Sequence, residues 1–219
     1  HKGAQNPAYF LDPDVEVFDE WQERADGWIA KIAIAPERDG APEFCAEMVD
    51  RGVHVALGHS DATYEEALAC VNAGADIFVH TYNGMSGLHH REPGMVGAAM
   101  TTHGTYAEAI CDGHHLNPIA VRALVNAKGY DHTVLITDCM RAGGMPNGQY
   151  KLGDFPVVVE GGTARLMDES HSLAGSILRL FEGVKNVFDW GIVSAEEAVR
   201  MASENPARSC GIDDVCGFI

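Results

Sequence analysis

The sequence predicts an α/β fold in which parallel strands alternate with helices and close into a barrel. Five short apolar runs recur in the first two thirds of the chain, and their ends lie 22 to 31 residues apart, the length of one strand and one helix. The runs are almost continuously apolar, which is typical of strands buried on both faces. A doubly wound open sheet would give similar patterns. We favour a barrel because polar residues follow several successive strands, whereas open sheets gather ligands at one switch point.

The expected strands and helices follow one another in a regular order. The apolar runs end at Glu37, Ser60, Tyr82, Gly113 and Asp138, and helix-like segments cover 42–51, 62–73 and 117–128. Ser60 or Asp61 is the expected N-cap of the second helix, with Gly74 as its stop. The third opens with Asn117-Pro118 and closes at Gly129.

The alternation ends after Asp138. Residues 139–150 are rich in Gly, Met and Asn and predict a mobile loop. Phe155–Met167 predicts a hairpin that turns at Gly161-Gly162. Helices are expected at 176–190 and 195–203, and a short one opens at Asn205-Pro206. No linker interrupts the chain, so residues 1–219 are expected to form one domain.

The charge and cysteine content of the chain limit its possible binding partners and location. The formal charge of −17 argues against nucleic acid or an anionic membrane as the main partner, and an anionic substrate would need a local basic patch. The six cysteines show no CxxC or metal-knuckle spacing, which favours a reducing, cytoplasmic location. The chain begins with His rather than Met, and we expect it to be part of a longer protein.

Two histidines at the ends of consecutive strands give the sharpest chemical signal. His59 and His80 lie 21 residues apart, so their side chains should converge above a parallel sheet, where neutral imidazole suits a divalent metal. Asp138 ends a third strand and could exchange protons with a metal-activated water. Taken singly, each histidine could be a hydrogen-bonded strand-end residue, and Asp138 a turn residue.

Two further segments could bind substrate. The loop 83–94 offers Asn83, the glycine amides that begin at Gly84, and the guanidinium of Arg91, groups that suit a phosphate or carboxylate. The segment 112–115 supplies His115 for substrate hydroxyls or phosphate. The loop could equally be a solvated surface loop. GxGxxG, GxxxxGK[ST] and GxSxG patterns are absent from the sequence, which disfavours dinucleotide, P-loop and serine-hydrolase functions.

Taken together, these segments resemble the N-acetylglucosamine-6-phosphate deacetylase family of the amidohydrolase superfamily. The motifs occur in family order through nearly the whole chain: Lys2-Gly3-Ala4-Gln5-Asn6-Pro7, Ala35-Pro36-Glu37, Gly58-His59-Ser60-Asp61, His80-Thr81-Tyr82-Asn83-Gly84-Met85, Arg91-Glu92-Pro93-Gly94, Asp112-Gly113-His114-His115, Thr137-Asp138, Leu173-Ala174-Gly175-Ser176 and Asn205-Pro206-Ala207-Arg208.

The resemblance implies a partial (β/α)8 TIM barrel of the metal-dependent amidohydrolase type, without the N-terminal barrel strands and the small β-sandwich domain. It implies a homodimer that acts on a small-molecule sugar phosphate. His59 and His80 would be metal ligands, and Asp138 the catalytic acid/base that serves a metal-activated water. Substrate contacts would fall on Ala4, Gln5, Asn83, Gly84, Arg91, His115, Leu173, Ala174 and Gly175. The metal would be zinc, with iron, manganese and cobalt as alternatives.

Two departures from the family pattern affect the site. The family's glutamate ligand lies in a His-Leu-Glu-Gly-Pro-type segment upstream of residue 1, so these 219 residues alone are expected to bind metal weakly and to show little activity. Gln5 stands where many members carry a histidine, and it can donate a hydrogen bond but cannot carry charge.

Two other functions remain open from the sequence. One is an amidohydrolase that acts on a cyclic amide or on another N-acyl sugar. The other is a non-catalytic domain that binds a sugar phosphate, in which the two histidines and Asp138 would be incidental.

Overall fold

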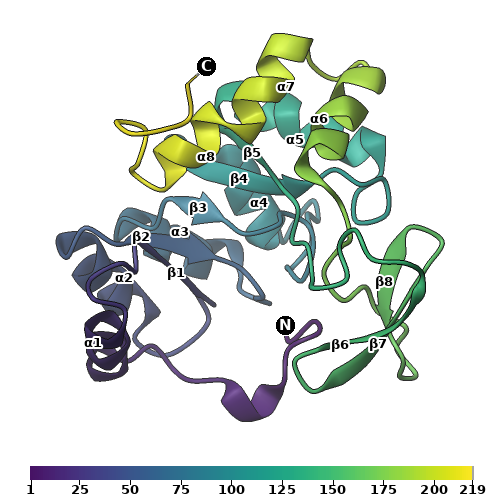
Figure 1. The fold of residues 1–219 in the computed structure, drawn as a ribbon. Helices are drawn as coiled ribbons and strands as arrows, with labels where there is room; N and C mark the ends of the chain where they lie inside the picture. Colours follow the sequence, from purple (N-terminus) through teal and green to yellow (C-terminus); the bar gives the residue numbers. More distant parts are fainter. Residues whose placement is uncertain (219) are drawn as a thin grey trace.

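A five-stranded parallel sheet forms the centre of the molecule in the computed structural model, which describes residues 1–218 (Figure 1). Its strands are β1 (Lys31–Ile34), β2 (His54–Leu57), β3 (Ile77–Phe78), β4 (Tyr106–Ile110) and β5 (Thr133–Ile136). Each strand pairs in parallel with the next one along the chain, in the order β1-β2-β3-β4-β5. This sequential order is that of a barrel wall, whereas a doubly wound sheet would show a switch point.

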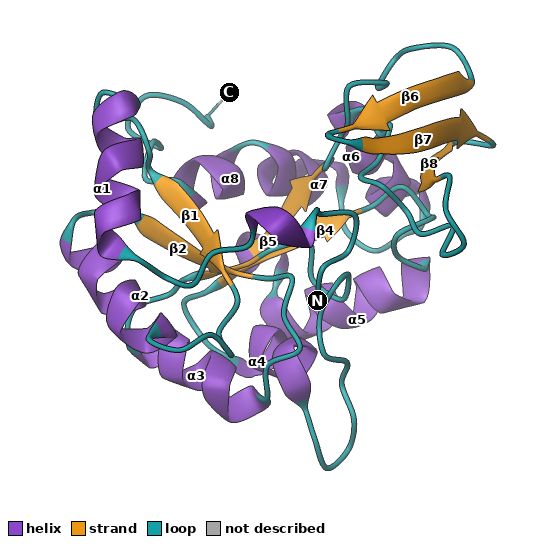
Figure 2. Cartoon of the chain, turned by 90° about the horizontal axis from the view of Figure 1, so that it is seen from below, coloured by secondary structure: helices purple, strands orange, loops and turns teal. Residues whose placement is uncertain are grey.

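Helices cover the outer face of this sheet. Figure 2 shows α1 to α5 around the strands. Their bounds are α1 Val15–Arg24, α2 Ala41–Asp50, α3 Tyr64–Asn72, α4 Gly94–Thr101, α5 Pro118–Lys128, α6 Leu180–Asp189, α7 Ala195–Ala202 and α8 Glu204–Ser209, with single turns of 3-10 helix at Pro7–Tyr9 (η1) and Tyr130–His132 (η2). Among residues 1–218, no helix has the length and apolar character needed to cross a membrane.

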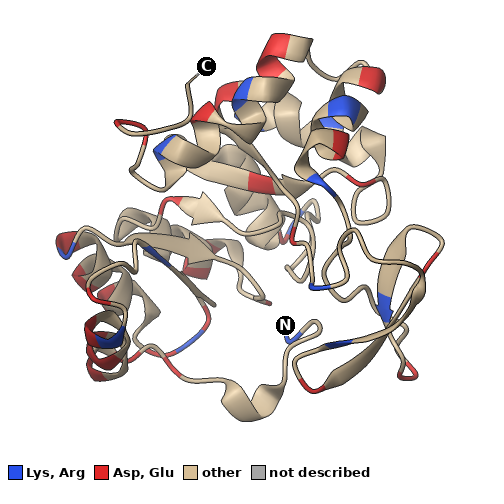
Figure 3. Cartoon of the chain, in the orientation of Figure 1, with Lys and Arg blue, Asp and Glu red and all other residues tan. Residues whose placement is uncertain are grey.

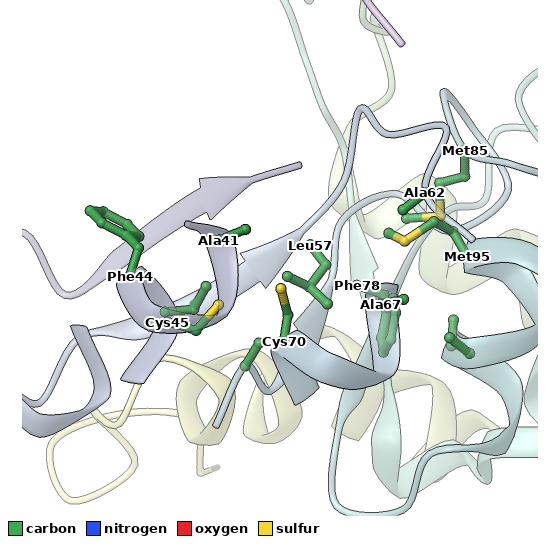
Figure 4. Close-up of a cluster of buried hydrophobic side chains, with 14 of the residues drawn as sticks. Ala41, Phe44, Cys45, Leu57, Ala62, Ala67, Cys70, Phe78, Met85 and Met95 are labelled. Carbon is green, nitrogen blue, oxygen red and sulfur yellow. The ribbon is translucent and has the colours of Figure 1, made fainter. Parts of the chain in front are cut away.

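Alternate residues of each strand face the helices. Leu57 of β2 packs with Phe44 and Cys45 of α2 in one buried cluster (Figure 4), which also includes Val55. Ala107 and Ala109 of β4 belong to a second cluster. The alternating residues of β4, Glu108 and Ile110, therefore point to the opposite face, the barrel interior. Acidic residues lie on outer helices such as α1 (Figure 3).

A separate antiparallel sheet follows β5. It consists of β6 (Gly148–Leu152), β7 (Phe155–Glu160) and β8 (Thr163–Leu166) in that order. The β7–β8 hairpin confirms the turn predicted at Gly161-Gly162. The predicted loop 139–150 is three residues shorter than expected, because β6 begins at Gly148 and pairs with β7.

Some local predictions needed correction. The N-cap of α3 is Thr63, which forms a capping box with Glu66, rather than Ser60 or Asp61. Ser60 is engaged elsewhere, since its hydroxyl donates to Glu37. Helix α6 starts at Leu180, four residues later than expected, whereas the cap of α5 at Asn117-Pro118 and its stop at Gly129 are confirmed.

Candidate metal and substrate site

Four polar residues occupy the same position relative to their strands. His59, His80, Asp112 and Asp138 each lie two residues after the last residue of β2, β3, β4 and β5. Because the strands are parallel and neighbouring, these residues gather at one end of the sheet, where (β/α) barrels carry their sites. The strands are shorter than the sequence indicated, so these residues belong to the turns that leave the sheet.

Three of these residues have an uncommon backbone conformation. The φ angles are +48° for His59, +29° for His80 and +48° for Asp138, a region that residues other than glycine seldom adopt. Such strain persists only where the surrounding structure imposes it, and it is concentrated at functional sites. The strain at these three positions marks the same end of the sheet as a candidate site.

The two imidazoles meet through their Nε2 atoms, which lie 3.0 Å apart. Nδ1 of His59 lies 3.1 Å from the carbonyl oxygen of His1, so this nitrogen carries the proton and Nε2 presents a lone pair. Burial lowers the pKa of His59 to about 4, and His80 and the amino terminus act in the same direction. The His59 side chain is therefore neutral, which is the form that binds metals.

His80 is buried beside His59. Its residue is 7% exposed, and its Nδ1 is buried without a hydrogen-bond partner among residues 1–218. If Nδ1 carries the proton, two Nε2 lone pairs face each other, an arrangement that a bound cation would satisfy. Within the described part of the chain, no group of three or more His, Cys, Asp or Glu side chains forms a complete metal site. The donor set is thus a pair of imidazoles.

Asp138 is the carboxyl group in this site that is best suited to accept a proton. Burial raises its pKa above the ordinary aspartate value, and Glu108 adds to the rise, while His80 and His115 act against it. A partly buried carboxylate with a raised pKa holds a proton more readily than a surface one, which suits acid/base chemistry.

Asp112 and His115 form a buried pair beside this group. One carboxylate oxygen of Asp112 accepts the backbone N–H groups of His114 and His115 at 2.8 and 2.7 Å. The other lies 2.7 Å from Nδ1 of His115, which therefore carries the proton and leaves Nε2 as the free nitrogen. The sequence suggested His115 as a substrate contact but gave no role to Asp112.

A cavity of ≈ 760 Å³ joins these groups. Ten of the twelve residues that the sequence suggested for the site line it, namely Ala4, Gln5, His59, His80, Asn83, Gly84, His115, Asp138, Leu173 and Gly175. The turn between β6 and β7 adds Gly153 and Asp154 to its wall, two residues that sequence reasoning missed.

Two of the suggested residues lie outside this lining. Ala174 is fully buried, and its neighbours on either side line the cavity instead. Arg91 lies in an exposed loop, where its Nε donates to His90 at 3.0 Å. The structure therefore brings together the imidazoles, the carboxyl group and the glycine loop, but not the guanidinium.

Glu37 ties the ends of β1 and β2 together. Its carboxylate accepts the Ser60 hydroxyl at 2.6 Å and the Asp61 backbone N–H at 3.0 Å. Ser60 N in turn donates to the carbonyl oxygen of Gly84 at 2.9 Å. This network holds the residue that follows His59 against the loop that follows His80, so Glu37 supports the site without lining its main cavity.

Comparisons with known proteins agree on one group of enzymes. No family model matches the chain. An N-acetylglucosamine-6-phosphate deacetylase from Vibrio furnissii is 45% identical over 219 residues, which cover 100% of this chain and 54% of that protein. An N-acetylgalactosamine-6-phosphate deacetylase from Escherichia coli O157:H7 is 42% identical over 219 residues, 57% of its length. The chain spans about half the length of these relatives.

A shorter relative is covered over most of its length. It comes from Escherichia coli K12, is described as a candidate N-acetylgalactosamine-6-phosphate deacetylase, and is 47% identical over 141 residues, which are 64% of this chain and 83% of that protein.

Solved structures give the same result. An N-acetylglucosamine-6-phosphate deacetylase from Pasteurella multocida matches 100% of the chain and 56% of its own length, with a TM-score of 0.91 and 29% identity. An aspartate-to-alanine variant of the Mycobacterium smegmatis enzyme, solved with N-acetyl-D-glucosamine 6-phosphate, matches 96% of the chain and 56% of its own length, with a TM-score of 0.90 and 33% identity.

Proposed function

Because the chain belongs to the N-acetylglucosamine-6-phosphate deacetylase family, we propose that the protein is a hydrolase that removes the acetyl group from N-acetylglucosamine 6-phosphate. The products are glucosamine 6-phosphate and acetate. The observation that carries this proposal is the convergence of His59, His80 and Asp138, all in strained backbone conformations, in one cavity.

His59 and His80 are the proposed ligands of a divalent cation, with zinc the first metal to test and iron, manganese and cobalt as alternatives. Such a cation would acidify water and polarise the acetamide carbonyl. The two Nε2 atoms, 3.0 Å apart, support this assignment.

Asp138 takes the proton from the attacking water and then gives it to the departing amine. Its raised pKa supports both steps, since the carboxyl group must hold the proton between them. His115, with its proton fixed on Nδ1 by Asp112, offers Nε2 to a substrate hydroxyl in the cavity. Gln5 also lines the cavity and offers a side-chain amide to the acetyl oxygen.

We propose that Asn83, Gly84 and Arg91 bind the phosphate. Nδ2 of Asn83 is a buried donor without a partner among the described residues, and Gly84 lines the same cavity. Arg91 lies outside the cavity on an exposed loop, and we propose that it reaches the phosphate in the cavity of a partner subunit of a homodimer. Phosphate binding by a guanidinium would orient the amide at the other end of the sugar.

The whole protein is proposed to comprise this barrel segment together with the remaining strands and a small β-sandwich domain. A cytoplasmic location is proposed because all six cysteines, including the buried Cys45, Cys70 and Cys111, are free thiols in the described chain.

A second substrate, N-acetylgalactosamine 6-phosphate, is favoured by two of the relatives, at 42% and 47% identity. The test is acetate release by the metal-loaded, full-length protein from the two phosphorylated sugars and from unphosphorylated N-acetylglucosamine. The proposal predicts a higher kcat/KM for a phosphorylated sugar than for the unphosphorylated one. Equal values, or no acetate release from any of the three sugars, would refute it.

A further inference from the structure

An ion pair crosses the barrel interior beneath the candidate site. Lys31 of β1 pairs with Glu108 of β4, although β2 and β3 lie between these strands in the sheet. Figure 3 shows the acidic band on β4, in which Glu108 is the one acidic residue. The Glu108 side chain is 7% exposed and that of Lys31 28% exposed. The pair is therefore largely removed from water.

Glu108 also accepts hydrogen bonds from the backbone N–H groups that follow β3. The paired register of β3 and β4 ends at Phe78 and Ala107. Beyond it, the backbone N–H of His80 donates to the second carboxylate oxygen of Glu108 at 3.4 Å, and the N–H of Thr81 donates to the backbone carbonyl of the same residue at 2.7 Å. One residue thus receives two successive amides where the backbone turns.

These contacts fall on the residue with the uncommon conformation. His80 has a φ of +29°, which costs conformational energy unless neighbouring groups impose it. Lys31 neutralises one oxygen of Glu108 and leaves the other free to accept the His80 amide. The conformation of His80 is therefore tied to a charge pair that starts on the far strand β1.

Stability alone does not explain a buried ion pair, because replacing one by apolar residues of similar size is often neutral or stabilising. We propose that the Lys31–Glu108 pair is a positioning device for His80: Glu108 accepts its backbone N–H and holds the imidazole toward His59, and Lys31 fixes Glu108. This role rests on the proposed function, in which His80 binds the metal. Neither residue lines the cavity of the candidate site.

Two matched double variants of the full-length protein separate acceptor from charge. K31M/E108Q removes both charges and keeps an oxygen that can accept the His80 N–H. K31M/E108L removes both charges and the acceptor, with side chains of similar size. Three quantities are measured: the Zn²⁺ dissociation constant by chelator competition, the melting temperature of the metal-free protein, and hydrogen exchange of the His80 amide.

We expect K31M/E108L to melt at or above the wild-type temperature, to bind Zn²⁺ about 10–100-fold more weakly, as for other groups that orient a ligand, and to exchange its His80 amide faster. K31M/E108Q keeps the acceptor but loses the ion pair that fixes it, so its Zn²⁺ affinity and amide protection should lie between those of the wild type and of K31M/E108L. If the leucine variant binds Zn²⁺ and protects the amide as well as the glutamine variant does, the proposal is overturned. The proposal is also overturned if, in both double variants, the loss of Zn²⁺ affinity merely follows the loss of melting temperature.

The amide measurement keeps this test separate from the proposed function. If the wild-type protein binds no metal and releases no acetate, the proposed function fails, and the exchange difference still tests the positioning contact. The single variants E108Q and E108L, which retain Lys31, serve if a double variant does not fold. Exchange of the His80 amide that is as fast in E108Q as in E108L, at equal melting temperature, would count against the acceptor role of residue 108.

Discussion

Replacing Asp112 by Asn should reverse the proton position on His115 and weaken catalysis. In the wild type, one oxygen of Asp112 accepts two backbone N–H groups and the other faces Nδ1 of His115 at 2.7 Å. Asparagine keeps the first oxygen and places an NH₂ group opposite Nδ1. Since two N–H groups cannot face each other, the proton of neutral His115 must move to Nε2.

The size of the effect follows from the bonds that change. The D112N variant keeps both backbone hydrogen bonds and loses one charge-assisted bond, so its free energy of unfolding should fall by about 1–3 kcal/mol. If Nε2 accepts a substrate hydroxyl, reversing its role costs about 1.5–3 kcal/mol in the transition state. The expected loss in kcat/KM is therefore about 10–100-fold.

The assay combines kcat/KM for acetate release with ¹⁵N NMR of the histidine tautomer. D131N is a matched control, because Asp131 also pairs with a nearby histidine, His132. This second pair lies before β5 rather than after a strand, and both of its side chains are more exposed. It should leave kcat/KM unchanged. If D112N shifts the proton to Nε2 and kcat/KM changes no more than in D131N, the reasoning about His115 is refuted.

The same variant has a pH signature. Burial alone would raise the pKa of Asp112, but the hydrogen bonds from the side chain and backbone of His115 and from the backbone of His114 hold it below the ordinary value. A carboxyl group with a lower pKa in the folded state stabilises the fold above its unfolded pKa, and this contribution is lost as the pH falls through the folded pKa. The difference in unfolding free energy between wild type and D112N should therefore shrink below about pH 4.

Three further predictions concern the rest of the site. D138N should abolish acetate release while leaving the Kd for the sugar phosphate nearly unchanged by calorimetry; turnover at the wild-type rate would contradict the acid/base role of Asp138, and a wild type that binds the sugar phosphate without releasing acetate would support a binding domain. R91A should raise KM more for the phosphorylated than for the unphosphorylated sugar. Mixing R91A subunits with D138N subunits should restore activity, and no recovery would place Arg91 in the site of its own subunit. E37A should weaken Zn²⁺ binding about tenfold, because it removes the hydrogen bonds to Ser60 and Asp61. The control variant E65A, on an exposed position of helix α3, should bind Zn²⁺ as the wild type does. Equal Zn²⁺ affinities of E37A and E65A would exclude a supporting role for Glu37.

The barrel wall and most of the site could be predicted because their signals are local. Continuous apolar runs mark the strands, and the histidines and Asp138 stand directly after them. The α5 cap at Asn117-Pro118 is likewise encoded by adjacent residues. Parallel strands bring residues at equivalent ends together, so local position was enough to predict the convergence of His59 and His80.

Elements whose stability comes from tertiary contacts could not be predicted in this way. Helix α4 is buried over nearly all of its length and contains two glycines, so it has no amphipathic period. Strand β6 is recognisable only through its pairing with β7. The N-cap at Thr63 was missed because Ser60, a better-placed hydroxyl by sequence, is held by the distant Glu37.

The positioning role of Glu108 could not be predicted from the sequence either. Glu108 stands among apolar residues in β4, and a charge in such a strand indicates that a counter-ion is needed. Its partner Lys31 lies 77 residues earlier, and nothing in the local pattern connects the two. Only the folded chain shows that the pair reaches His80.

The most direct test of the central claim is the rate of acetate release from N-acetylglucosamine 6-phosphate by the zinc-loaded, full-length protein and by its H59A/H80A variant. We expect turnover by the wild type, loss of bound zinc and turnover in the variant, and a melting temperature of the metal-free variant close to that of the wild type. A variant that folds and still releases acetate at the wild-type rate would contradict the assignment of these two histidines to the reaction.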